Sequence, residues 1–231
     1  MGESFWQWPN LLHNTGTYDK KSDIRWVCQS NEKCFEVVLQ MNKDKIIRVI
    51  TVTPVVTTGM LLTLFVLRSE IFPNALYLML TIFFLSAMTL IAYPLQKVLP
   101  GWKEKGRDGQ RMFALYLGAV GYLLGFMVNL IIPSTKGLDV IYGIYALSVV
   151  ILFVFNKLIK IKASGHIGGL TCIMLVFVYF GLYIPAFIAA LIMVPVIVSS
   201  LRMKRHTPKE FLCGAICAFL AMGMIIMVYG V

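Results

Sequence analysis

The fold is decided by an uncharged stretch in the first half of the chain, Ile71-Phe-Pro-Asn-Ala-Leu-Tyr-Leu-Met-Leu-Thr-Ile-Phe-Phe-Leu-Ser-Ala-Met-Thr-Leu-Ile-Ala-Tyr-Pro94. A helix needs about 20 mainly apolar residues to cross the hydrocarbon core of a bilayer. This stretch is long enough and contains no Lys, Arg, Asp or Glu. It therefore predicts a membrane-spanning helix.

The composition extends this interpretation to the whole chain. Of the 231 residues, 58% are hydrophobic and 14% are charged, and the mean hydropathy is +0.79. A soluble domain carries about 25% charged residues, so this class is excluded. The sequence predicts an all-α, polytopic membrane bundle of about six to seven transmembrane helices. We expect a multi-pass integral protein of the cell (plasma) membrane, with the lipid bilayer as its surroundings.

Further apolar runs divide the chain into a polar N-terminal segment, residues 1–45, and a membrane-embedded helical domain, residues 46–231. Three tryptophans in the N-terminal segment are typical of anchors at the membrane interface. Cys28 and Cys34 can pair there if the segment faces an oxidising compartment. The expected spans lie at about 46–67, 71–94, 112–132, 138–155, 167–201 and 209–229. The run 167–201 is long enough for two short spans or for one re-entrant hairpin.

The net charge of +10 is concentrated in three basic loops, 97–111, 157–162 and 202–210, each with a surplus of three positive charges. This distribution argues against nucleic acid as a partner. An even number of crossings separates successive loops, so we expect all three on one face of the membrane. The positive-inside rule alone produces such an arrangement. It does not explain the two histidines that stand beside these loops, His166 and His206.

Two short motifs contain these histidines. Ser164-Gly165-His166 precedes an apolar run, and Glu210 follows His206 by four residues, so the two share one face if both are helical. A phosphate ester needs cationic donors, a nucleophile and an acid for the leaving oxygen. Basic side chains, a helix N-terminus and two histidines meet these needs without a metal or other cofactor. Thr207 and Glu210 also fit a capping box at the start of the last helix, and this role and the catalytic one need not exclude each other.

The two motifs resemble those of the type-2 phosphatidic acid phosphatase superfamily. Its members carry Pro-Ser-Gly-His in one motif and Ser-Arg-x5-His-x3-Asp in another, which opens the last helix. Here the counterparts are Ala163-Ser-Gly-His166 and the segment Ser199 to Glu210, followed by Phe-Leu-Cys-Gly214-Ala. The similarity covers residues 157–230, and the earlier chain is similar only in hydropathy.

The resemblance implies a role for each matching residue. His206 would be the nucleophile that forms a phosphohistidine, Glu210 would orient it, and His166 would be the general acid. Ser164 and Gly165 would bind phosphate oxygens. The family is metal-independent and removes phosphate from lipid phosphates or polyprenyl diphosphates.

The chain departs from the family pattern at several positions. Ala163 replaces the proline, Glu210 replaces the aspartate, and Ser200 stands where the family has an arginine. We expect Arg202 to supply that charge. The first motif of the family, Lys-x6-Arg-Pro, finds its nearest counterparts in the first two basic loops, and the candidates for phosphate binding are Lys105, Arg111, Lys157, Lys160 and Lys162.

The sequence thus predicts a phosphatase acting on a membrane lipid phosphate such as phosphatidic acid, phosphatidylglycerophosphate or a polyprenyl diphosphate. Two alternatives remain open. One is a non-catalytic relative that binds anionic lipid headgroups through the same residues. The other is a transporter, against which stands the lack of charged residues in the interior of the spans, away from their ends.

Overall fold

Seven helices make up the part of the chain that the structure describes. In the computed structural model, the described residues are 46, 50–203 and 206–230. The chain forms two units, Met1–Asn42 and Lys43–Val231. The predicted polar segment 1–45, with Cys28 and Cys34, lies outside the described residues. All the described helices belong to the second unit.

The helices agree with the predicted apolar runs. They are α3 (Thr53–Leu67), α4 (Ala75–Ile82) continued by the π-helical turn η2 (Phe83–Ala87) and α5 (Met88–Val98), α6 (Gly106–Ile131), α7 (Lys136–Phe153) continued by the π-helical turn η4 (Val154–Leu158), α8 (Gly165–Tyr179), α9 (Tyr183–Arg202) and α10 (Pro208–Tyr229). Five of these seven are long and apolar enough to cross a bilayer, and the shorter two are α3 and α8. By helix length and composition, the chain is a multi-pass integral membrane protein, as predicted.

Polar side chains mark where several helices begin. Asn74 accepts hydrogen bonds from the backbone N–H groups of Leu76 and Tyr77, and Thr135 accepts one from Leu138. Such N-caps satisfy backbone donors that have no partner within the helix. In a bilayer this matters more than in water, because no solvent replaces a missing partner.

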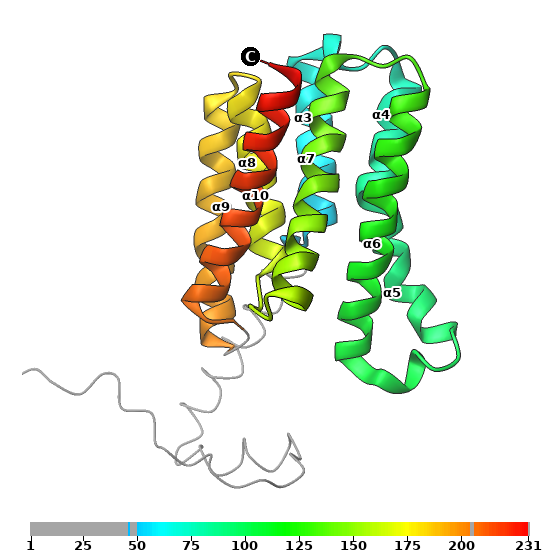
Figure 1. Cartoon of the computed structure of the whole chain (residues 1–231), viewed down its shortest axis with the longest axis vertical. Coiled ribbons are helices and arrows are strands. Elements are labelled where there is room, and N and C mark those ends of the chain that lie inside the picture. Colours follow the sequence, from blue (N-terminus) through cyan, green and yellow to red (C-terminus); the bar gives the residue numbers. More distant parts are fainter. Residues whose placement is uncertain (1–45, 47–49, 204–205, 231) are drawn as a thin grey trace, which may run out of the picture. The chain divides into compact units, whose positions relative to one another are not determined.

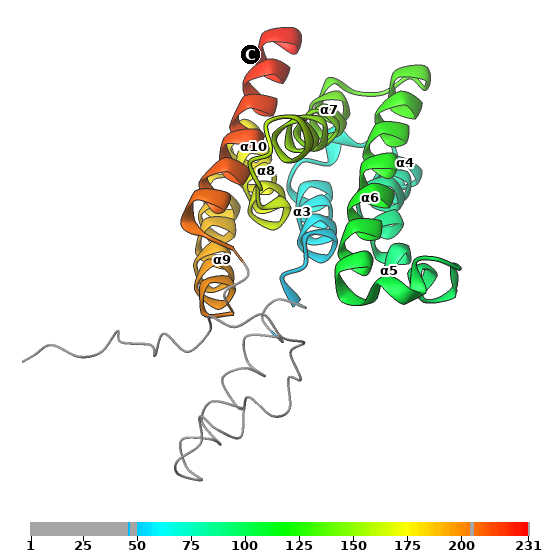
Figure 2. The same cartoon turned by 60° about the horizontal axis from the view of Figure 1, so that its bottom comes forward.

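Helices α3 and α7 lie at the centre of the bundle, between α8, α9 and α10 on one side and α4, α5 and α6 on the other (Figures 1 and 2). Tyr145 of α7 is 1% exposed, and its hydroxyl lies 3.0 Å from Oγ1 of Thr57 in α3. Tyr142, also on α7, donates to Thr81 of α4 at 3.2 Å. Interhelical hydrogen bonds of this kind contribute about 0.6 kcal/mol each in a membrane. They join α7 to α3 and to α4.

Two glycines on α6 permit its close contact with the helix before it. A Cβ atom at Gly121 would lie 2.6 Å from the carbonyl oxygen of Phe84, and one at Gly125 would lie 2.7 Å from the Cβ of Phe84. Neither position has room for a larger residue. The two glycines are four residues apart, a spacing typical of close helix packing in membranes.

The ambiguous run 167–201 forms two helices, α8 and α9, which lie side by side in Figures 1 and 2. They are joined by a tight turn in which Gly181 has φ +71° and the Leu182 N–H donates to the Phe177 carbonyl at 2.8 Å. A positive φ is readily adopted only by glycine.

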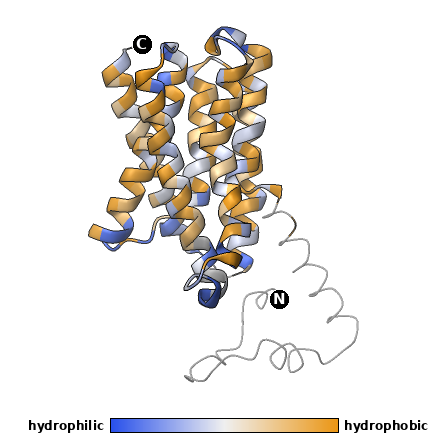
Figure 3. Ribbon diagram, turned by 90° about the vertical axis from the view of Figure 1, so that its right-hand side faces the viewer, coloured by the Kyte–Doolittle hydropathy of each residue, from blue (hydrophilic) through white to orange (hydrophobic). Residues whose placement is uncertain are grey.

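This topology brings the links α5–α6, α7–α8 and α9–α10 to one end of the bundle (Figure 1), the arrangement that parity predicts. In Figure 3 hydrophobic colour follows the helices, and the hydrophilic residues gather at their ends.

Candidate functional site

The first turns of α8 and α10 are held together through their backbones. The Ser164 N–H donates to the carbonyl oxygen of Glu210 at 2.9 Å. This approach requires glycine on both helices, because a Cβ at Gly214 would lie 2.3 Å from the Ser164 carbonyl oxygen and one at Gly168 would lie 3.0 Å from the Gly214 carbonyl oxygen. The two motifs that the sequence singled out are therefore in direct contact at their helix N-termini.

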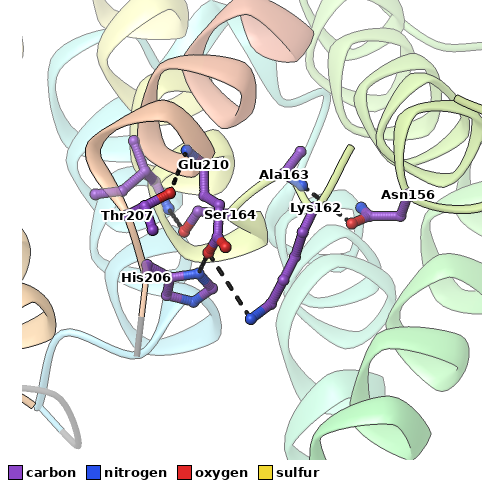
Figure 4. Close-up of polar contacts among 8 residues, drawn as sticks. Asn156, Lys162, Ala163, Ser164, His206, Thr207 and Glu210 are labelled. Atoms are coloured by element: carbon purple, nitrogen blue, oxygen red, sulfur yellow. Dashed lines mark hydrogen bonds and ion pairs between the residues drawn. The ribbon is translucent and has the colours of Figure 1, made fainter. Parts of the chain in front are cut away.

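His206 and Glu210 form the central pair of this junction (Figure 4). Nδ1 of His206 lies 2.5 Å from Oε2 of Glu210, and the two side chains are 11% and 18% exposed. An ionised carboxylate can only accept a hydrogen bond, so Nδ1 carries the proton. In the neutral ring this leaves Nε2 with a lone pair. The His206 ring also rests against the Phe211 ring, with centroids 5.6 Å apart.

Lys162 reaches the same carboxylate from the α7–α8 loop. Its Nζ lies 3.8 Å from Oε2 of Glu210, and its side chain is 64% exposed (Figure 4). Because exposed ion pairs contribute little to stability, the pair places a positive charge beside the histidine rather than holding the fold together. Among the basic residues predicted to bind phosphate, Lys162 contacts the Glu210 carboxylate of the pair.

The predicted capping role of Thr207 is confirmed. Its Oγ1 accepts a hydrogen bond from the Glu210 N–H at 3.4 Å, and Pro208 occupies the first turn of α10. The Glu210 carboxylate, however, is directed at His206 and Lys162. Thr207 therefore caps the helix, as one half of the predicted capping box, while the Glu210 carboxylate contacts the imidazole of His206.

Ser164 is the N-cap of α8. It is fully buried, and its hydroxyl accepts from the Ile167 N–H at 3.5 Å. Gly165 and His166 follow in the first helical turn, where backbone N–H groups point out of the helix end and favour an anion. Gly165 is exposed. The α8 N-terminus thus offers donors next to the His206–Glu210 pair.

The other predicted phosphate ligands lie on other elements of the fold. Lys105 lies in the α5–α6 loop with its Nζ 4.3 Å from the centre of the Trp102 ring, on the opposite side of the bundle from α9 and α10 (Figures 1 and 2). Arg202 is exposed at the C-terminus of α9. Arg111 lies in α6, and its side chain is outside the described residues. Ser200, at the position of the family's arginine, is 3% exposed within α9.

Sequence reasoning missed Asn156. Its Nδ2 donates to the Leu152 carbonyl at 2.7 Å, and its Oδ1 accepts from the Ala163 N–H at 3.0 Å (Figure 4). The side chain thus ties the end of α7 to the residue before Ser164. The available signal was a single amide side chain at the end of an apolar span. The segment was instead interpreted by the positive charge of the lysines that follow.

No family model, curated protein or solved structure matches the chain. Among the described residues, no group of three or more His, Cys, Asp or Glu side chains is arranged to hold a metal ion.

Proposed function

We propose that this protein is a lipid phosphate phosphatase, a divergent relative of the type-2 phosphatidic acid phosphatases that works through a phosphohistidine. The observation that carries the proposal is the 2.5 Å contact between Nδ1 of His206 and the Glu210 carboxylate, at a junction of two helix N-termini. A histidine held by a carboxylate through one nitrogen presents the other as nucleophile or base.

In the first step, Nε2 of His206 attacks the phosphorus of a lipid phosphate monoester. The N–P bond forms while the bond from phosphorus to the lipid oxygen breaks. The lipid oxygen takes a proton from His166, and the lipid leaves as the free alcohol. As the imidazole gains positive charge, Glu210 stabilises it through the Nδ1–H.

In the second step, water attacks the phosphohistidine. His166, now neutral, takes a proton from the water, the P–N bond breaks, and inorganic phosphate leaves with His206 regenerated. The sum is hydrolysis of one phosphoester bond by one water, with no metal and no other cofactor in either step. A positioned acid or base of this kind contributes about 10²- to 10⁴-fold.

Negative charge on the transferred phosphoryl group needs compensation in both steps. Lys162, the first N–H groups of α8 and Arg202 are the donors that this end of the bundle offers. Charge-assisted hydrogen bonds from such groups are stronger than neutral ones. The location favours phosphatidic acid, phosphatidylglycerophosphate or a polyprenyl diphosphate as substrate, because their headgroups lie at the same depth as the ends of the spans.

The test is phosphate release by the detergent-purified full chain in excess chelator, with each of the three lipid classes as substrate. We expect turnover of at least one class and none by His206→Ala. Brief incubation with phosphate-labelled substrate should also leave an acid-labile, alkali-stable label on the wild-type chain. Full activity of His206→Ala, or no turnover of any of the three, contradicts the proposal.

A second candidate is a non-catalytic protein that binds anionic lipid headgroups at the same junction. Ser200 favours it, because a buried serine replaces a residue whose charge the family uses at the phosphate. This candidate predicts binding of phosphatidic acid that Lys162→Gln weakens, with no phosphate released over long incubation. Measured turnover rules it out.

A further inference from the structure

The segment 157–162, here called the lysine loop, exposes two kinds of side chain in alternation. Its lysines are all exposed. Between them the side chains of Leu158, Ile159 and Ile161 are 73%, 49% and 43% exposed. Leu158 ends the apolar helix Lys136–Leu158, and Ile159 and Ile161 follow it at the end of the bundle. We expect side chains at the end of a span to lie at the boundary between the acyl chains and the headgroups, an environment of mixed polarity.

The loop is held in this conformation by its backbone. Asn156 bonds to both sides of it, as described above, and the Ile161 N–H donates to the Phe155 carbonyl at 2.9 Å. Lys160 has φ +60°, a left-handed conformation that side chains other than Gly, Asn and Asp seldom adopt. Such a backbone persists only where its surroundings enforce it. The outward direction of these side chains is therefore part of the folded structure.

Alternating lysine and branched apolar residues suit one environment in particular. At the surface of a bilayer, apolar side chains enter the boundary between headgroups and acyl chains. Lysines bury their stems in the same layer and place the ammonium beside lipid phosphates. Neither water nor the hydrocarbon core satisfies both kinds at once.

We propose that the lysine loop is a docking surface for anionic phospholipid and that it presents the lipid headgroup to the His206–Glu210 pair. Lys162 connects the two, because it belongs to the loop and its Nζ lies 3.8 Å from the Glu210 carboxylate. The presentation step rests on the proposed function, whereas the docking step does not. The lipid enters from the membrane side, with its acyl chains against Leu158 and Ile159 and its phosphate among the lysines.

The docking step is tested by binding, without any turnover. The probe is a fluorescent phosphatidylglycerol titrated against the detergent-purified full chain and followed by anisotropy, with phosphatidylcholine of the same chain length as the neutral comparison. The charge variant combines Lys157→Gln with Lys160→Asn, since asparagine tolerates the left-handed conformation. Each lysine beside an anionic surface contributes about a factor of five, so we expect affinity for the anionic lipid to fall about 25-fold.

The apolar variant combines Leu158→Ser with Ile159→Ser and should weaken both lipids about fivefold or more. Matched controls lie at the other end of the bundle. Val228→Ser removes an apolar side chain that is also 73% exposed, and Lys136→Gln removes an exposed lysine. Both controls should bind as wild type. Unchanged affinity in the two loop variants, or equal loss in the controls, overturns the docking surface.

Two further measurements ask whether the phosphate group alone accounts for binding and whether the loop acts in lipid binding or in catalysis. Inorganic phosphate should displace the labelled lipid poorly from wild type, and full displacement at equal concentration would overturn the role of the apolar residues. In turnover, the apolar variant should lose rate on phosphatidic acid in vesicles while retaining the wild-type rate on p-nitrophenyl phosphate. If wild type hydrolyses neither substrate, the proposed function fails, and the binding experiment still decides the docking surface.

Discussion

Two basic loops of this protein carry the same surplus of charge and differ in what the fold does with it. Residues 97–111 and residues 157–162 each have three more positive than negative groups, and both lie at the same end of the bundle (Figure 1). In the α5–α6 loop, Lys105 rests on Trp102. In the α7–α8 loop, Lys162 reaches Glu210 on a different helix.

The α5–α6 loop contacts only the two helices that it joins, in the interactions described for it. Trp102 packs against the rings of Phe113 and Tyr116 on α6, at 5.1 and 6.3 Å between centroids, and the Gln96 side chain donates to the Trp102 carbonyl. The second loop leads into a helix whose N-cap, Ser164, bonds to α10. Charge therefore indicates the face of the membrane, while the contact between helices decides which basic loop belongs to a site.

The largest difference in kcat should be between variants of one acidic residue from each region. The Glu210 carboxylate can only accept a hydrogen bond and so keeps the proton of His206 on Nδ1. The amide of Glu210→Gln can also donate, so it no longer selects this tautomer, and we expect kcat to fall about 100-fold or more. Glu104→Gln removes an exposed carboxylate in the α5–α6 loop and should change the rate less than about twofold. Steady-state phosphate release measures both. Equal effects would remove the distinction between the regions.

The next effect concerns the backbone contact. Gly214→Ala places a methyl group 2.3 Å from the Ser164 carbonyl oxygen, so α8 and α10 must separate. A displacement of this order costs about tenfold to 100-fold in rate, and overpacking costs about 1–3 kcal/mol in stability.

The control for this substitution lies on the same helix. Gly223 has nothing within 4 Å of its Cβ position, so Gly223→Ala should keep the full rate and gain about 0.5–1 kcal/mol from helix propensity. Thermal unfolding in detergent and the rate are measured together. A fully active Gly214→Ala would show that the close contact is not needed.

The two lysines provide a smaller effect. Lys162→Gln should raise KM for phosphatidic acid about tenfold, because a charged donor to the phosphate is lost. Lys105→Gln should leave KM within about twofold, since its ammonium rests on Trp102. If Lys105→Gln has the larger effect, the family's first motif lies in the α5–α6 loop and the site extends across the bundle.

The smallest effect on rate should come from the amides that hold each loop. Asn156→Ala and Gln96→Ala both remove side-chain hydrogen bonds to the backbone, at about 1–3 kcal/mol of stability each. Only Asn156→Ala should also lower the rate, about threefold to tenfold, because it frees the segment that positions Ser164. Thermal unfolding compared with kcat separates the two. A rate loss in both variants would indicate general destabilisation.

The helices were predictable because the signal is local. Spans such as residues 71–94 are recognised by their length and lack of charge, and the structure has a helix there. Thr207 is recognised as a helix N-cap by its position before Pro208, and the structure confirms that role. The run 167–201 was not predictable, since its length allowed two topologies. The turn at Gly181, with its positive φ, shows that it forms two helices.

The candidate site divides in the same way. The spacing of four residues singled out His206 and Glu210 as a pair, and the structure shows the contact. It does not lie on one helix, however, because His206 precedes α10, which begins at Pro208, so the contact depends on the path of the chain into that helix. The choice of Lys162 over Lys105, and the clamp at Asn156, depend on segments that are distant in the chain or on the path of a loop. No periodicity reports such contacts.

Local features of the chain predicted a membrane protein, most of its helices and a common face for its basic loops, because hydropathy, capping and parity are properties of consecutive residues. The meeting of α8 and α10 at their N-termini was visible only in the folded structure, because it depends on whether two backbones fit. The fit is made by the absence of a side chain at Gly214 and Gly168. It gives the α7–α8 loop a partner on α10, whereas the α5–α6 loop, with equal charge, contacts its own hairpin.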